Sequence, residues 1–143
     1  MRSVITRIGI QTTRDTEMID VTERVSDAVR ASGISDGMAL FMTLHTTTGV
    51  TVNEGLPDLE GDLLELLADL VPPSRRYRHA RFLASDGQMA VNAPSHLRGA
   101  LLGMQAAFPI VDGRLLMGSR HTIYLVELDG PLYRETIVQA LGE

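Results

Sequence analysis

The chain has 143 residues, a length that fits one ordinary domain with a substantial core. Hydrophobic residues make up 44% of it and charged residues 22%, which is typical of a globular protein and excludes a disordered chain. The absence of cysteine excludes disulfides, thiolate metal sites and a cysteine nucleophile. The 13 Lys and Arg positions are all arginine, which excludes Schiff-base chemistry and a P-loop lysine.

The net charge of −5 argues against nucleic acid as the main partner. No stretch approaches the roughly 18 apolar residues that a membrane-spanning helix needs. The first residues also lack the apolar segment of a signal peptide. We therefore expect a cytoplasmic protein that neither enters a membrane nor binds nucleic acid.

The first part of the chain predicts two strands and a helix. Ser3 to Gln11 alternates well enough for a strand, and Glu17 to Val21 is expected to pair with it across a polar turn. Thr22 is a favoured helix N-cap residue, and Gly33 is expected to end the helix that Thr22 begins.

Two more strands and a leucine-rich helix follow. Met38 to His45 is predicted as a strand, and Val50 to Asn53 resumes the alternation after a bend. Pro57 is expected to begin a helix that ends before Pro72. Its leucines form one broad apolar stripe of Leu59, Leu63, Leu66, Leu67 and Leu70.

Residues 74–93 lack clear periodicity and are predicted as a long loop, which in a compact domain tends to be functional. Pro94 then begins a short helix that ends at Gly103.

The last third of the chain is predicted to be β. Asp112-Gly113 between two apolar runs indicates a hairpin. Thr122 to Leu128 is a further strand, and Arg134 to Leu141 is expected to return after a turn at 129–131. This order of elements predicts a single α+β domain over residues 1–143, with a largely antiparallel sheet covered by helices.

His45 begins the densest group of polar residues in the sequence. Hydroxyls, an amide and a carboxylate follow within ten residues, and Thr47 and Asn53 are expected to share the face of His45. Glu54 comes directly afterwards and could act as a base. The alternative is a solvated strand end with ordinary turn chemistry, and spacing alone leaves both readings open.

The other histidines offer further candidates. His79 lies in an arginine-rich stretch that could bind phosphate or could pair with the acidic helix before it. His96 falls in the first turn of a predicted helix, where it could cap the helix or lie beside a bound anion. His121 alternates in step with Ile123 and Leu125, which places it on the inward-facing side of the predicted strand, and it could simply be buried. The arginines around His79 are Arg75, Arg76, Arg78 and Arg81.

Three neutral imidazoles that meet in space would suit Zn²⁺ or a similar ion. No local signature such as HExxH supports such a site, so spacing alone leaves the metal hypothesis weak. The sequence also lacks the motifs of serine hydrolases, dinucleotide-binding folds and P-loops.

An ordered series of motifs over about residues 37 to 142 resembles the YjbQ-like uncharacterised protein family, also described as secondary thiamine-phosphate synthases. The first motif is Leu44 to Glu54, which is similar to the family's His-Thr-Ser/Thr-Ala-Gly-Leu-Thr-Ile-Asn-Glu. The later motifs are Asp62 to Leu64 with Leu70 to Pro72, Tyr77 to His79, Ser95 to Arg98 with Ala100 to Gly103, and Pro109 to Leu115 with Gly118.

Two segments depart from the family. Gly118-Ser119-Arg120-His121 replaces its usual Gly-Thr-Trp-Gln, and residues 89–94 lack the additional histidine or Asp-Asn pair that is often present there.

The resemblance implies an α+β fold, usually as a homotrimer, with the histidines in a pocket near subunit contacts. It also implies a divalent metal, zinc or magnesium, on His45, His79 and His96. The activity attributed to the family is weak and joins a pyrimidine pyrophosphate to a thiazole phosphate. Glu54, His45 and Ser119 are the candidate catalytic residues. The candidates for binding the phosphorylated small-molecule substrate are Thr47, Asn53, Arg78, Arg98 and His121.

A second hypothesis uses the same histidines without catalysis. The chain would then be a metal- or ligand-binding homotrimer of unknown physiological role.

Overall fold

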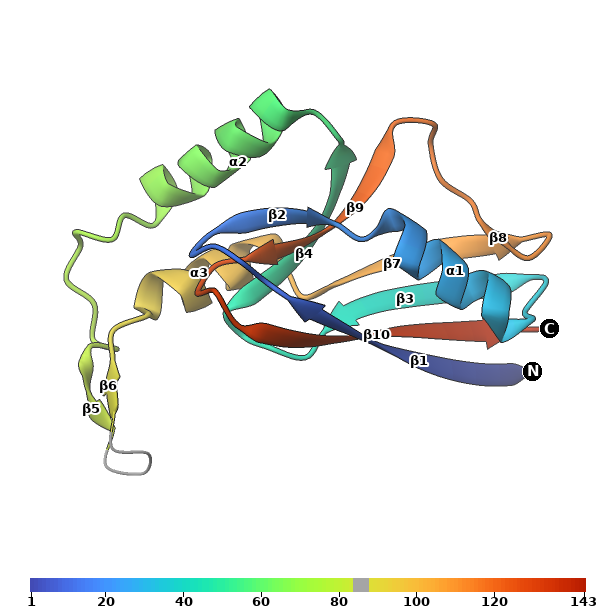
Figure 1. The fold of residues 1–143 in the computed structure, drawn as a ribbon, viewed down its shortest axis with the longest axis horizontal. Coiled ribbons are helices and arrows are strands. Elements are labelled where there is room, and N and C mark those ends of the chain that lie inside the picture. Colours follow the sequence, from blue (N-terminus) through green and yellow to red (C-terminus); the bar gives the residue numbers. More distant parts are fainter. Residues whose placement is uncertain (84–87) are drawn as a thin grey trace.

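Two antiparallel sheets form the centre of the computed structural model, which describes residues 1–83 and 88–143 (Figure 1). The larger sheet has five strands in the order β1-β10-β3-β7-β8, and the smaller has three in the order β2-β9-β4. A two-stranded ribbon of β5 and β6 lies apart from both (Figure 1). The strands are β1 (Arg2–Gln11), β2 (Glu17–Asp20), β3 (Gly37–Thr43), β4 (Thr48–Glu54), β5 (Arg81–Leu83), β6 (Gln88–Ala90), β7 (Gln105–Val111), β8 (Arg114–Leu115), β9 (His121–Glu127) and β10 (Tyr133–Gly142).

The helices are α1 (Thr22–Ser32), α2 (Pro57–Leu70) and α3 (Ala93–Leu102). As predicted, α1 ends at Gly33, whose φ of 69° is a left-handed conformation that favours glycine. Thr22 is not the N-cap, because that position belongs to Val21, and the Thr22 hydroxyl instead donates to Asp20 Oδ1 at 2.7 Å. Within the described ranges, no helix is long and apolar enough to span a membrane.

The middle strand of the smaller sheet is buried on both faces and separates two apolar cores. Ile123 and Leu125 face the main core, which lies between the two sheets and includes the buried side of α1. Tyr124 and Val126 face the second core, where they pack with Leu67 of α2. Because both faces are covered, β9 is an almost continuous apolar run, and the position of the charged residue Glu127 at its end is therefore unusual.

Three of the connections that pass between the sheets meet at one end of the molecule. They link β1 to β2, β3 to β4 and β9 to β10. The strand registers show the meeting point: Gln11 pairs with Tyr133 in the larger sheet, and Thr48 pairs with Glu127 in the smaller. Segments 12–16, 44–47 and 128–132 are the three crossovers, and this name is used for them below.

These crossovers correct several predictions. The first two strands do not pair with each other, because β1 pairs with β10 and β2 pairs with β9. Likewise, β10 does not return beside β9 but joins the larger sheet. His45 lies in a crossover, since β3 ends at Thr43. In every case the strand was predicted but its partner was not, because long-range packing decides which sheet a strand joins.

Two predictions about the middle of the chain also need correction. The predicted loop 74–93 contains β5 and β6 and the start of α3, with residues 84–87 outside the described part. The leucine stripe of α2 is only partly buried, because Leu67 is buried whereas Leu66 is 52% exposed and Leu70 is 59% exposed.

Candidate functional site

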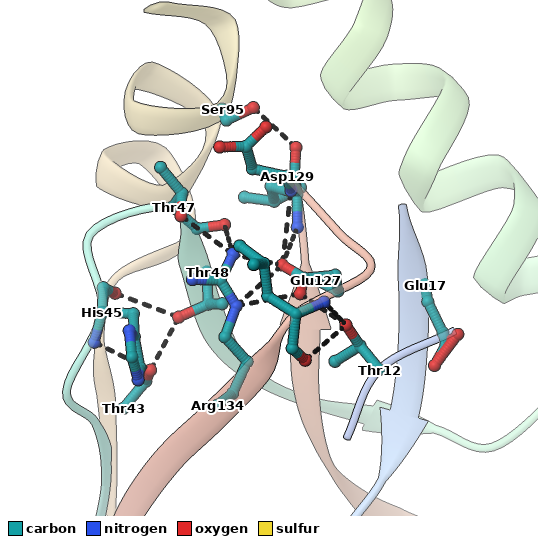
Figure 2. A network of polar contacts seen from close by, with 12 residues as sticks. Thr12, Glu17, Thr43, His45, Thr47, Thr48, Ser95, Glu127, Asp129 and Arg134 are labelled. Atoms are coloured by element: carbon teal, nitrogen blue, oxygen red, sulfur yellow. Dashed lines mark hydrogen bonds and ion pairs between the residues drawn. The ribbon is translucent and has the colours of Figure 1, made fainter. Parts of the chain in front are cut away.

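A buried ion pair joins the three crossovers (Figure 2). Glu127 is completely buried and Arg134 is 3% exposed. Arg134 Nη2 donates to Glu127 Oε2 at 2.6 Å, and its Nε donates to Oε1 at 2.8 Å. Thr12, from the first crossover, donates to Glu127 Oε1 at 2.7 Å, and Arg134 Nη2 donates to Thr47 Oγ1 in the second at 2.9 Å. One carboxylate and one guanidinium therefore connect segments that are far apart in the sequence.

The bonds to Glu127 keep it ionised. Burial raises the pKa of the carboxyl, but hydrogen bonds from Arg134, Thr12 and the Asp129 backbone, together with the Arg134 charge, bring this pKa below its usual value. The Leu128 N–H adds another bond to Oε2 at 3.0 Å. Such a pair is stable in a dry interior because its polar atoms are paired.

The threonines beside His45 have a structural role. Thr48 donates to the His45 carbonyl at 3.0 Å, and its hydroxyl lies 2.6 Å from that of Thr43 (Figure 2). The His45 ring is also engaged, because the Glu135 N–H donates to its Nε2 at 2.9 Å. In the neutral ring the proton then resides on Nδ1. Thr47, which is predicted to bind substrate, is buried and its hydroxyl accepts a hydrogen bond from Arg134.

Two of the predicted metal ligands lie side by side. The rings of His79 and His96 are 5.2 Å apart between centroids and meet edge to face at 84°. Both rings are partly exposed. Both also border a small hollow of about 320 Å³, whose walls include Tyr77 and Leu97. The structure therefore brings together two histidines that are 17 residues apart in the sequence.

A larger hollow of about 660 Å³ adjoins the first and shares Tyr77 and His79 with it. Three arginines line it: Arg75, Arg76 and Arg78. Among the described side chains, no ion pair joins these arginines to the acidic helix α2. The three guanidinium groups therefore border one hollow, and the predicted pairing with α2 is not formed among the described side chains. Tyr77 anchors the segment, since its hydroxyl donates to the Pro72 carbonyl at 2.7 Å.

The start of α3 links His79 to a crossover. Asn92 Oδ1 lies 3.2 Å from His79 Nε2, and Asn92 Nδ2 donates to Asp129 Oδ2 at 2.8 Å. Ser95 Oγ donates to the Leu128 carbonyl at 2.6 Å (Figure 2). Thus α3 is bound to the crossover that lies between Glu127 and Arg134.

Arg98, predicted to hold phosphate, has a structural contact. Its Nε and Nη2 donate to the Val71 carbonyl at 3.2 and 2.8 Å, which fixes α3 against the end of α2.

The remaining predicted site residues lie at the other end of β4, near its last residue Glu54. Seven residues of β-strand span about 20 Å, so within one chain Glu54 is well separated from His45. Glu54 Oε1 pairs with Arg120 Nη1 at 2.7 Å, and His121 is its register partner on β9. Asn53 and Ser119 belong to the same exposed end. One chain therefore brings the candidate base Glu54 beside His121 and not to the predicted metal ligand His45.

The sequence matches the family model of the UPF0047 protein YjbQ-like family over residues 6–143. The chain belongs to this family. A UPF0047 protein of Archaeoglobus fulgidus is 37% identical over 134 residues, which cover 94% of this chain and 98% of that protein. The UPF0047 protein YugU of Bacillus subtilis is 32% identical and covers 94% and 97% of the two chains. A crystal structure of a protein of unknown function from Sulfolobus solfataricus P2 has a TM-score of 0.91 at 34% identity and covers 99% of both chains.

These similarities confirm the family resemblance and the α+β fold. Membership in the YjbQ-like family does not by itself place a metal in this chain. The centroid separation of 5.2 Å between His79 and His96 is close to the roughly 5 Å expected for two imidazoles on one zinc ion at about 2.0–2.1 Å, but this separation alone does not direct a nitrogen of each ring to one point. Among the described residues, however, no group of three or more His, Cys, Asp or Glu side chains could hold a metal. The predicted set of three histidines is therefore not assembled within one YjbQ-like chain.

Sequence reasoning missed the residues that organise this YjbQ-like site. Glu127 had a detectable signal, since it is a charged residue at the end of an apolar strand and is followed seven positions later by Arg134. Asn92 and Asp129 had no such signal, because an asparagine before a helix and an aspartate in a turn are ordinary choices.

Proposed function

We propose that the chain is a cytoplasmic small-molecule enzyme that joins a pyrimidine pyrophosphate to a thiazole phosphate, giving thiamine phosphate and pyrophosphate. The observation that supports this proposal is the position of His79 and His96 beside a hollow lined by Arg75, Arg76 and Arg78. Guanidinium groups bind phosphate oxygens through paired, charge-assisted hydrogen bonds. An imidazole beside them could transfer a proton near neutral pH.

The arginines would act mainly on the leaving pyrophosphate. Negative charge accumulates on that group as its C–O bond to the methylene carbon of the pyrimidine breaks and the thiazole nitrogen bonds to this carbon, and cations fixed near the leaving group lower the barrier. A divalent metal held by His79 and His96 would add to this stabilisation. Of the two candidates, zinc suits imidazole ligands, whereas magnesium prefers oxygen.

A homotrimer would explain how such a site is completed. Leu97 and Leu101 are 45% and 61% exposed, and they lie one turn apart on α3, next to His96. Burial of both leucines against a second subunit would remove this apolar surface from water. We propose that His45 or Glu54 of a neighbouring subunit approaches the His79 and His96 pair. For His45, Nε2 would be the ligating atom, and the hydrogen bond that it accepts from the Glu135 N–H within its own chain would have to break, since Nδ1 carries the proton of the neutral ring.

The test is complementation of a strain that lacks thiamine-phosphate synthase, combined with assays of the purified enzyme. Wild type should restore growth, His79→Ala and His96→Ala should not, and Arg24→Gln on the exposed side of α1 should behave as wild type. Failure of well-expressed wild type to complement, together with no product in the assay, would refute this activity.

One observation favours a second candidate, a non-catalytic metal- or ligand-binding homotrimer. Within one chain the hollow joins imidazoles and arginines, whereas Glu54 is paired with Arg120 elsewhere. This candidate predicts stoichiometric metal that His79→Ala or His96→Ala removes, with no turnover. Elemental analysis beside the synthase assay separates the two candidates.

A further inference from the structure

We propose that Asn92 and Asp129 are positioning residues that fix the tautomer and the direction of the His79 ring. The inference rests on the proposed function only in taking His79 as a working group of the site. It adds two residues that the family motifs do not include, and it assigns each nitrogen of His79 a separate task.

Hydrogen-bond chemistry determines the direction of the chain of contacts. An ionised carboxylate only accepts, so Asp129 Oδ2 requires the NH₂ of Asn92 at 2.8 Å. The Asn92 carbonyl oxygen must then face His79 Nε2 at 3.2 Å, and this nitrogen must carry a proton. In the neutral ring, Nδ1 keeps its lone pair free to accept a proton or bind a metal.

Asn92 makes these contacts instead of a more usual one. It occupies the N-cap of α3, where an asparagine side chain ordinarily accepts a hydrogen bond from the first turn of the helix. Here its side chain makes no capping bond, and its backbone carbonyl accepts from Ser95 N at 3.0 Å and His96 N at 3.3 Å. The amide is thus turned toward His79 and Asp129 while its backbone is fixed by the helix.

Asp129 is equally well fixed, because it lies two residues after the buried Glu127. Its N–H donates to Glu127 Oε2 at 3.3 Å. His79 has no regular element to hold it, since it lies between α2 and β5. Its ring is therefore oriented by Asn92 on one side and by the edge-to-face contact with His96 on the other.

The decisive measurement is a two-bond ¹H–¹⁵N spectrum of the histidine-labelled full chain, at a pH well above the ordinary histidine pKa of about 6.5. His79→Gln identifies the signals of His79. Wild type should show a protonated Nε2 and an unprotonated Nδ1. Asn92→Ala and Asp129→Asn should move the two nitrogen shifts toward each other as a second tautomer appears.

Asp129→Asn is the informative variant because residue 129 does not touch His79, and its new amide lets Asn92 rotate. Ser95→Ala is the matched control, since it removes a bond between α3 and the same crossover without touching the chain of contacts. Ser95→Ala should leave the nitrogen shifts of His79 unchanged. The proposal would be overturned if the wild-type spectrum placed the proton on Nδ1, or if Asp129→Asn also left these shifts unchanged. Expected spectra without synthase activity would refute the proposed function and support the positioning of His79.

Discussion

Replacing Arg134 with methionine should destabilise the fold severely. The substitution roughly keeps the apolar stem but removes the three bonds to Glu127 and the bond to Thr47 Oγ1. Thr12 and two backbone N–H groups still reach the carboxylate, so it keeps partners but loses its cation. Breaking a buried pair from one side costs about 3–5 kcal/mol, and we expect a loss in that range.

The loss should depend on pH in a defined direction. The lowered pKa of Glu127 in wild type contributes stability that is present above the unfolded value of about 4.3 and is lost as the pH falls through the folded pKa. Without Arg134 burial remains, so the pKa of Glu127 rises. The Arg134→Met variant should therefore recover part of its deficit relative to wild type as the solution is acidified.

Urea unfolding followed by circular dichroism, at one protein concentration, measures both effects. The exposed pair Arg120–Glu54 provides the control, because Arg120 is 80% exposed and Arg120→Met should cost at most about 1 kcal/mol. A Glu127→Gln/Arg134→Met double variant should be at least about 1 kcal/mol more stable than Arg134→Met, since no charge is left buried. Equal losses for Arg134→Met and Arg120→Met would refute the reasoning.

Three more predictions concern helix seating, a buried phenol and anion binding. Gly99→Ala should lower the free energy of unfolding by about 1–3 kcal/mol, because its Cβ would lie 2.8 Å from the Thr48 carbonyl oxygen. The Cβ of Gly61→Ala would meet nothing within 4 Å, and this variant should raise the free energy of unfolding by about 0.5–1 kcal/mol. Thermal melts compare the two variants, and equal shifts would contradict the close packing at Gly99. The pKa of Tyr124 is raised mainly by burial and further by the hydrogen bond and charge of the Glu60 carboxylate. The stability that this raised pKa gives the fold is therefore fully present below about pH 10 and is lost as the pH rises through the folded pKa. A tyrosinate absorbance titration should show one of the three tyrosines ionising only with unfolding, and three ordinary titrations would refute this. Arg78→Gln should weaken inorganic pyrophosphate binding about tenfold in calorimetry, and an unchanged affinity would remove Arg78 from the anion site.

Local signals predicted the parts of the fold that depend on a few neighbouring residues. Gly33 ends α1 because a left-handed residue is needed there, and Asp112-Gly113 forms the hairpin because both residues have positive φ. The pairing of β1 could not be predicted in this way. Its partner is β10, with Arg2 opposite Gly142, and such a contact is decided by how both sheets close around the core.

The candidate site shows the same division. The family motifs include His79 and His96, which the structure brings together. Glu54 is in the same motif as His45 but lies at the other end of β4, beside His121 of β9. Sequence order cannot distinguish these cases, because a strand of seven residues carries its two ends about 20 Å apart.

The crossovers explain why the motif around His45 combines structural and functional signals. His45 and Thr47 connect β3 and β4 to the start of β10, through Glu135 and Arg134. The same end of the molecule seats α3, since the Thr48 carbonyl leaves no room for a side chain at position 99. His96 lies on α3, so its position beside His79 depends on the crossovers that close the two sheets. A loss of function in a variant of this motif must therefore be compared with its loss of stability before either is assigned to chemistry.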